Sequence, residues 1–82
     1  MPIICMLEGI KIEMYFDDHN PPHFHATYGD DKAIVSITEA TIMQGKLPIK
    51  KLKILLGWTV LHEDELMDMW NTQSIHRLEG FR

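Results

Sequence analysis

Residues 23–38, HFHATYGDDKAIVSIT, decide the fold because two strand-like segments flank a turn. Residues 23–28 are typical of a β-strand, and residues 32–38 alternate apolar side chains with mostly polar ones. Gly29-Asp30-Asp31 separates the two segments and predicts a turn. The stretch therefore predicts a β-hairpin, in which the two strands run antiparallel.

A second hairpin is expected on the N-terminal side of this one. Residues 3–7 are apolar enough for a short strand, and Glu8-Gly9 is a turn of hairpin length. Residues 10–16 alternate between apolar and other side chains, which predicts a half-buried strand. Its apolar face carries Ile10, Ile12 and Met14. Residues 41–43 are expected to add a short fifth strand.

The segment 48–70 repeats apolar side chains with the period of an α-helix. The apolar arc spans roughly 200°, which is wide for a surface helix. A sheet would cover part of this arc, and we expect the remainder to meet a partner or a second layer. Glu63 lies near the middle of the arc, so either the helix breaks around His62 or Glu63 has a buried partner. The arc consists of Leu52, Leu55, Leu56, Val60, Leu66, Met67, Met69 and Trp70, with Trp58 at its edge.

These elements predict an α+β fold in which residues 1–82 form a single domain. We expect a small, mainly antiparallel sheet of four to six strands, packed against one C-terminal helical region. The tail, residues 75–82, is expected to add a final short strand along the sheet.

The composition is that of an ordinary globular protein, with 45% hydrophobic and 24% charged residues. The formal net charge of −4 argues against a general nucleic-acid coat. No stretch approaches the roughly 20 apolar residues of a membrane span, and no signal-peptide pattern is evident. Cys5 is the single cysteine, so no disulfide can form within the chain. We therefore expect a cytoplasmic protein without membrane association.

Residues 19–25, His-Asn-Pro-Pro-His-Phe-His, concentrate three imidazoles beside two prolines. Imidazole is the side chain whose ordinary charge change lies nearest neutral pH. This histidine element therefore marks where chemistry would take place, with His23 and His25 as the candidate catalytic residues. The candidate polar or ligand site around them consists of Asp17, Asp18, His19, Asn20 and His62.

Three interpretations of the histidine element stay open. In the first, a rigid turn joins two strands, and the histidines hydrogen-bond to nearby carboxylates and backbone. In the second, His19, His23 and His25 are candidate ligands of a divalent metal, because residues two apart on a strand share a face. No other cofactor is expected.

In the third interpretation, His23 and His25 act as an acid–base pair that cleaves RNA. Such a site also needs cations for the phosphate oxygens. A candidate anion patch lies at the start of the helical region, where the backbone dipole also favours anions, and consists of Lys46, Lys50, Lys51 and Lys53.

Charge is unevenly distributed along the helical region. The lysines make its start basic, whereas Glu63-Asp64-Glu65 and Asp68 make it acidic toward its end. In one continuous helix, both groups would oppose the helix dipole. Such a bipolar pattern would fix the orientation of a docked partner.

Further motifs run along the chain: Gly9-Ile10-Lys11-Ile12, Met14-Tyr15-Phe16, the segment from Asp18 to His25, Tyr28, Gly45-Lys46-Leu47-Pro48, Trp58, His62, Glu65-Leu66 and Trp70. With these motifs the chain resembles the small bacterial proteins grouped as domain of unknown function 4160. The resemblance implies no established activity and identifies no catalytic residue. It does imply a small bacterial operon, often with another small protein of unknown function, in an arrangement similar to toxin–antitoxin modules.

The leading hypothesis is a cytoplasmic protein-interaction module, one component of a toxin–antitoxin-like pair. It would dock a small protein partner, or a second copy of itself, through the helix face. The alternative is a small ribonuclease or phosphodiesterase, or a metal-binding protein, that uses the histidine element. Whether the protein is an enzyme stays open.

Overall fold

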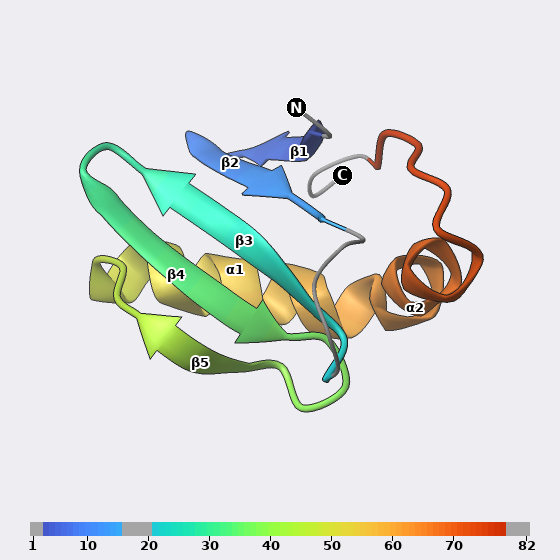
Figure 1. Ribbon diagram of the computed structural model, residues 1–82. Helices are drawn as coiled ribbons and strands as arrows, with labels where there is room; N and C mark the ends of the chain where they lie inside the picture. The colour runs from blue at the N-terminus through green and yellow to red at the C-terminus, as the bar shows by residue number, and fades with distance from the viewer. Residues whose placement is uncertain (1–2, 16–20, 79–82) are drawn as a thin grey trace.

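The computed structural model describes residues 3–15 and 21–78. It contains five strands followed by two helices (Figure 1). The expected α+β fold is confirmed, and the C-terminal helical region consists of two helices. The elements are β1 (Ile3–Leu7), β2 (Ile10–Glu13), β3 (His23–Tyr28), β4 (Asp31–Ser36), β5 (Thr41–Gly45), α1 (Ile49–Leu61) and α2 (Glu63–Thr72).

The strands form one antiparallel sheet in the order β1-β2-β3-β4-β5, so each strand pairs with its neighbours in sequence. Both predicted hairpins are present, and β3 has the predicted bounds. Three strands differ from expectation in length. β2 ends at Glu13 and β4 at Ser36, whereas β5 continues to Gly45.

The turn between β1 and β2 has left-handed backbone at both of its residues. Glu8 has φ 50° and Gly9 has φ 83°. Positive φ at both central residues defines a type I′ turn, whose twist matches that of the flanking strands. The expected two-residue hairpin turn is therefore confirmed.

One face of the sheet, which we call the covered face, packs against the helices (Figure 1). Alternation along each strand directs apolar side chains to this face, and the predicted Ile10, Ile12 and Met14 are fully buried. The ring of Phe24 on β3 meets that of Trp58 on α1 edge-on, with centroids 6.1 Å apart. Leu55, Leu66 and Met69 complete the helical side of this core.

The helical region breaks at His62, the position at which the sequence allowed a break. Its backbone there, with φ −109° and ψ 19°, separates α1 from α2. The break changes the electrostatics, because Glu63, Asp64 and Glu65 now form the first turn of α2. The positive end of that helix dipole stabilises them there, so the prediction that they oppose the dipole was wrong.

The tail forms no strand over residues 74–78, contrary to expectation. Within the described residues, one backbone hydrogen bond links the tail to the sheet, from Leu78 N–H to the carbonyl of Ile4 at 2.9 Å. The rest of the predicted strand, residues 79–82, lies outside the described residues. None of the helices in the described part of the chain combines the length and hydrophobicity needed to cross a bilayer.

Candidate functional site

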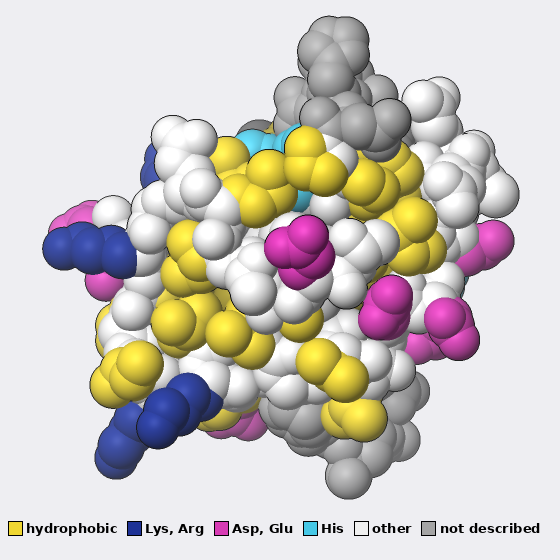
Figure 2. All heavy atoms as spheres, turned by 90° about the horizontal axis from the view of Figure 1, so that it is seen from below, with side chains coloured by type: hydrophobic (Ala, Val, Ile, Leu, Met, Phe, Trp, Pro, Cys, Tyr) yellow, Lys and Arg dark blue, Asp and Glu magenta, His cyan; other side chains and the backbone are white. Residues whose placement is uncertain are grey.

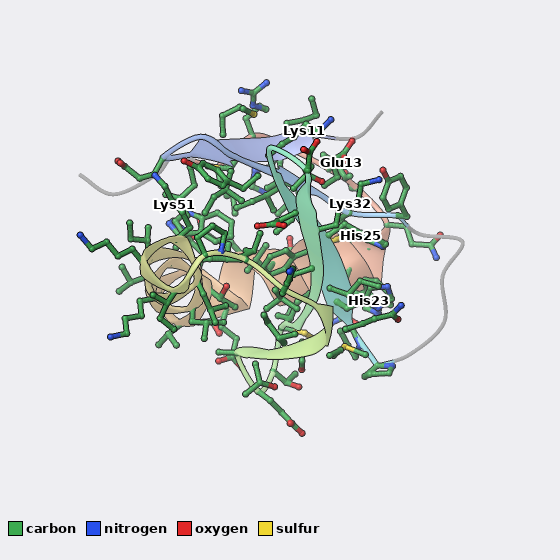
Figure 3. The ribbon with its side chains drawn as sticks, turned by 90° about the vertical axis from the view of Figure 1, so that its left-hand side faces the viewer. Lys11, Glu13, His23, His25, Lys32 and Lys51 are labelled. Carbon is green, nitrogen blue, oxygen red and sulfur yellow. The ribbon has the colours of Figure 1, made fainter. Side chains whose placement is uncertain are left out.

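His23 and His25 lie on the face of the sheet opposite the covered face, which we call the open face (Figure 3). Strand alternation gives both residues the same face, as the sequence predicted. His23 is buried, and its Nδ1 lies 2.8 Å from the carbonyl oxygen of Pro21, to which it donates. His25 is half-buried, one strand position from Phe24 on the covered face.

The two imidazoles belong to a row of aromatic rings. Tyr15 meets His25 edge-on with ring centroids 4.8 Å apart, and His25 lies 5.5 Å from His23. The indole of Trp70 on α2 continues the row at 5.2 Å from His23. The rings therefore pack against one another, and the hydrogen bond from His23 to the backbone of Pro21 is the kind of contact that the structural interpretation names.

The described residues contain no group of three or more His, Cys, Asp or Glu side chains placed to share a metal ion. His62 in particular is engaged elsewhere: its Nδ1 contacts Glu65 Oε1 at 2.5 Å, and its ring lies 4.9 Å from that of Trp58. The structure therefore does not bring His62 together with His23 and His25 as a ligand set. The candidates Asp17, Asp18, His19 and Asn20 lie outside the described residues, so a role for them stays a prediction.

The predicted anion patch divides into two parts. Lys51 donates from Nζ to the carbonyl oxygen of Glu8 at 2.8 Å and lies over the ring of Tyr28, 5.1 Å from its centroid. Lys51 thus ties α1 to the β1–β2 hairpin. The exposed members are Lys46, Lys50 and Lys53, and α1 has no acidic residue in its first turn to offset them.

The open face also contains a hollow that the sequence did not predict. It has a volume of about 430 Å³. Residues from β2, β3, β4 and β5 line it, so the sheet itself forms its floor. The side chains with polar or aromatic groups are Lys11, Glu13, Tyr15, His25, Thr27, Lys32 and Gln44. Figure 3 shows Lys11, Glu13, Lys32 and His25 on the same side of the sheet, away from α1.

Glu13 is the unusual member of this hollow. Only 3% of its surface is exposed, and its Oε2 atom has no hydrogen-bond partner among the described residues. Burying one carboxyl oxygen without a donor is costly, because the hydration lost by that oxygen is not replaced. Alternation alone placed Glu13 on the polar side of β2, where sequence reasoning expects exposure to water.

A second feature is an exposed apolar surface, which we call the docking surface and define as Ile49, Val60 and Leu61 of α1 with Met43 of β5. The exposed fractions are 64% for Ile49, 61% for Val60, 68% for Leu61 and 44% for Met43. Figure 2 shows one side of the molecule, where hydrophobic side chains are scattered over the surface and an acidic side chain lies near the centre of the view. Lysine and arginine side chains lie at one side of this view, and most acidic side chains lie at the other.

The fold and these surfaces define a small α+β protein with a five-stranded antiparallel sheet and two C-terminal helices. The model of the family described as Domain of unknown function (DUF4160) matches residues 9–71. The chain belongs to this family. No curated protein and no solved structure matches the chain.

Proposed function

We propose that the protein is an interaction module that binds a small partner protein through the docking surface, as one component of a toxin–antitoxin-like pair. The observation that carries the proposal is the exposure of Val60 and Leu61 at the end of α1. Val60 belongs to the apolar arc that elsewhere packs against the sheet, and Leu61 follows it outside that arc, yet no described residue covers either side chain. Exposed apolar side chains that gather on one face are typical of a binding site for another protein.

The charges around the docking surface support a partner of defined chemistry. Lys46, Lys50 and Lys53 lie at the start of α1, where the helix dipole disfavours them. An acidic group on the partner would offset this cost. At the other end, the acidic first turn of α2 would face basic groups. The partner therefore has an apolar centre between one acidic and one basic end, which fixes its orientation.

The small protein encoded beside this chain is the partner that the family resemblance favours. The test is to purify each protein alone and together, and to measure association by size-exclusion chromatography and isothermal titration calorimetry. We expect a complex at micromolar concentration. Two unshifted peaks on mixing would contradict the proposal, as would a dimer of this chain alone that mixing leaves unchanged.

Substitutions at two exposed methionines test where the interface lies. Met43→Asp places a charge on the docking surface, whereas Met6→Asp places the same charge on β1 at the opposite edge of the sheet. Met6 is 54% exposed and Met43 44%, so both variants should fold. We expect Met43→Asp to weaken the complex about tenfold or more, and Met6→Asp to leave it unchanged. Equal effects of the two changes would exclude the docking surface.

The toxin–antitoxin part has its own test, which is growth of cells that express either protein alone or both. We expect one of the two proteins to arrest growth alone, and joint expression to restore it. Leu61→Asp in this chain should remove the rescue if the docking surface carries the complex. Normal growth in every combination would contradict the toxin–antitoxin role.

A further inference from the structure

We infer that the hollow on the open face binds a guanine nucleotide, with Glu13 accepting hydrogen bonds from the base and Lys11 and Lys32 holding the phosphate. This site is distinct from the docking surface, because none of the four residues that define that surface lines the hollow. The inference begins with Glu13, because its buried Oε2 lacks a donor among the described residues. A ligand that offers N–H groups would supply the missing hydrogen bonds.

The register of the sheet places two kinds of group in adjacent rows of the hollow. Lys11, Thr27 and Lys32 occupy one row across β2, β3 and β4. Glu13, His25 and Ile34 occupy the next row along the same strands. Two residues of a strand span about 7 Å, so a ligand must extend over that distance to meet both rows.

The ligand must therefore carry an anion at one end and N–H donors at the other. Two lysines outnumber the single carboxylate, so the hollow favours a molecule with net negative charge. Among the described residues, the one ion pair joins His62 and Glu65, so neither Lys11 nor Lys32 is neutralised by a described side chain. Ammonium groups of this kind bind phosphate oxygens as point charges.

The size and the aromatic rings of the hollow point to a nucleotide. Its volume of about 430 Å³ falls in the range of roughly 300–1,000 Å³ typical of small-molecule sites. Tyr15 and His25 line it, and aromatic side chains on an open sheet face are a common stacking platform for bases. A carboxylate selects guanine among the bases, because guanine presents N1–H and the N2 amino group side by side on one edge.

The test is a set of binding measurements on the purified protein by calorimetry and by NMR chemical-shift changes. The probes are guanosine, inosine and adenosine 5′-monophosphates and inorganic phosphate. We expect guanosine monophosphate to bind tightest. Inosine monophosphate lacks the N2 amino group, and its binding should be about tenfold weaker, the usual effect of one hydrogen bond to a charged group. Equal affinity for the three nucleotides, or no binding at millimolar concentration to any probe, would overturn the inference.

Variants separate the two ends of the site. Glu13→Gln should remove the preference for guanine while leaving the weak binding of phosphate unchanged. Lys32→Ala should weaken every phosphate-bearing probe, whereas Lys53→Ala, an exposed lysine on α1, should weaken none. Loss of binding with Lys53→Ala would contradict the assignment, as would a guanine preference that survives in Glu13→Gln.

The nucleotide has two natural sources, a free mononucleotide or one residue of single-stranded RNA. To distinguish these two sources, the affinity of a uridine oligonucleotide that contains one guanosine is compared with that of guanosine monophosphate. The all-uridine oligonucleotide is the control. Tighter binding of the guanosine-containing strand than of guanosine monophosphate would assign the site to RNA, and similar affinities would assign it to the free nucleotide. Measurable and equal binding of both oligonucleotides would overturn the role of Glu13, whereas binding of guanosine monophosphate alone would assign the site to the free nucleotide.

Discussion

The two faces of the sheet differ in what surrounds neighbouring residues of the same strand. On β3, Phe24 is fully buried under α1 on the covered face, whereas the adjacent His25 is half-buried on the open face. The apolar side chains of the covered face pack against other residues of the same chain. The open face has a buried carboxylate, two lysines and a row of aromatic rings that do not form such a core. The covered face therefore supplies stability, and the open face is where ligand chemistry is expected.

The largest expected effect compares these two neighbours directly. Phe24→Ala should lower the free energy of unfolding by about 3–5 kcal/mol, because it leaves a cavity against Trp58. His25→Ala should cost about 1 kcal/mol or less, since its ring contacts lie at a solvated surface. Urea denaturation followed by tryptophan fluorescence measures both. Similar costs for the two substitutions would show that the open face is also part of the core.

The next effect tests the rim of the hollow. Gly45 has φ +86°, and a Cβ atom there would lie 2.1 Å from the backbone oxygen of Lys32. Gly45→Ala must therefore shift β5 away from β4, and we expect a loss of about 2–3 kcal/mol. Gly29→Ala is the matched control, since Gly29 also has positive φ, +60°, but has no atom within 4 Å of the added Cβ. Its cost should be about 1 kcal/mol, and an equal cost at both sites would contradict the steric explanation.

A smaller effect with the opposite sign is expected at Glu13. Glu13→Gln replaces a buried carboxyl group, whose Oε2 has no hydrogen-bond partner among the described residues, by a neutral amide of similar size. It should raise the free energy of unfolding by about 1 kcal/mol. Glu39→Gln, at an exposed position in the β4–β5 turn, should change it little. If Glu13 stabilised the fold, Glu13→Gln would instead lower the free energy of unfolding. Thermal denaturation that shows a lower Tm for Glu13→Gln would make Glu13 a structural residue.

Sequence patterns predicted the covered face well. Its residues repeat with the period of their own element, so Ile10, Ile12 and Met14 were assigned to the core from β2 alone. The bounds of β3 were also correct, because Pro22 and Gly29 delimit the strand on either side. The break at His62 was one of two alternatives, and the sequence could not decide between them, because the burial of α2 residues such as Leu66 and Met69 depends on the rest of the fold.

The open face was predicted only in part. His25 was identified because histidines stand out in a sequence, whereas Lys11, Glu13 and Lys32 were not. Their common position depends on the register of β2, β3 and β4, which a single strand does not show. The burial of Glu13 likewise results from neighbouring side chains on other strands. A polar residue within a strand is ordinarily solvated, so no local signal distinguished this one.

The smallest expected effect concerns the polar contact at the edge of the covered face. Lys51 donates to the carbonyl of Glu8 and lies over the ring of Tyr28, so it holds the β1–β2 hairpin to α1. Lys51→Met keeps most of the aliphatic chain but removes the ammonium group, and should cost about 0.5–1 kcal/mol. Lys53→Met removes an exposed ammonium group two residues further along α1, and we expect no measurable cost.

This pair determines whether apolar burial alone holds the helix on the sheet. A cost confined to Lys51→Met, and reduced in high salt, would show that a charged contact contributes at the rim of an otherwise apolar interface. Equal stability of Lys51→Met, Lys53→Met and the parent protein would show that it does not. Lys51 would then act like Lys50 and Lys53 near the start of α1. The helix dipole disfavours all three lysines there and would stabilise an acidic partner. In that case the lysines around the docking surface would present a larger positive charge than the observed contact of Lys51 allows, and partner affinity would depend more steeply on salt.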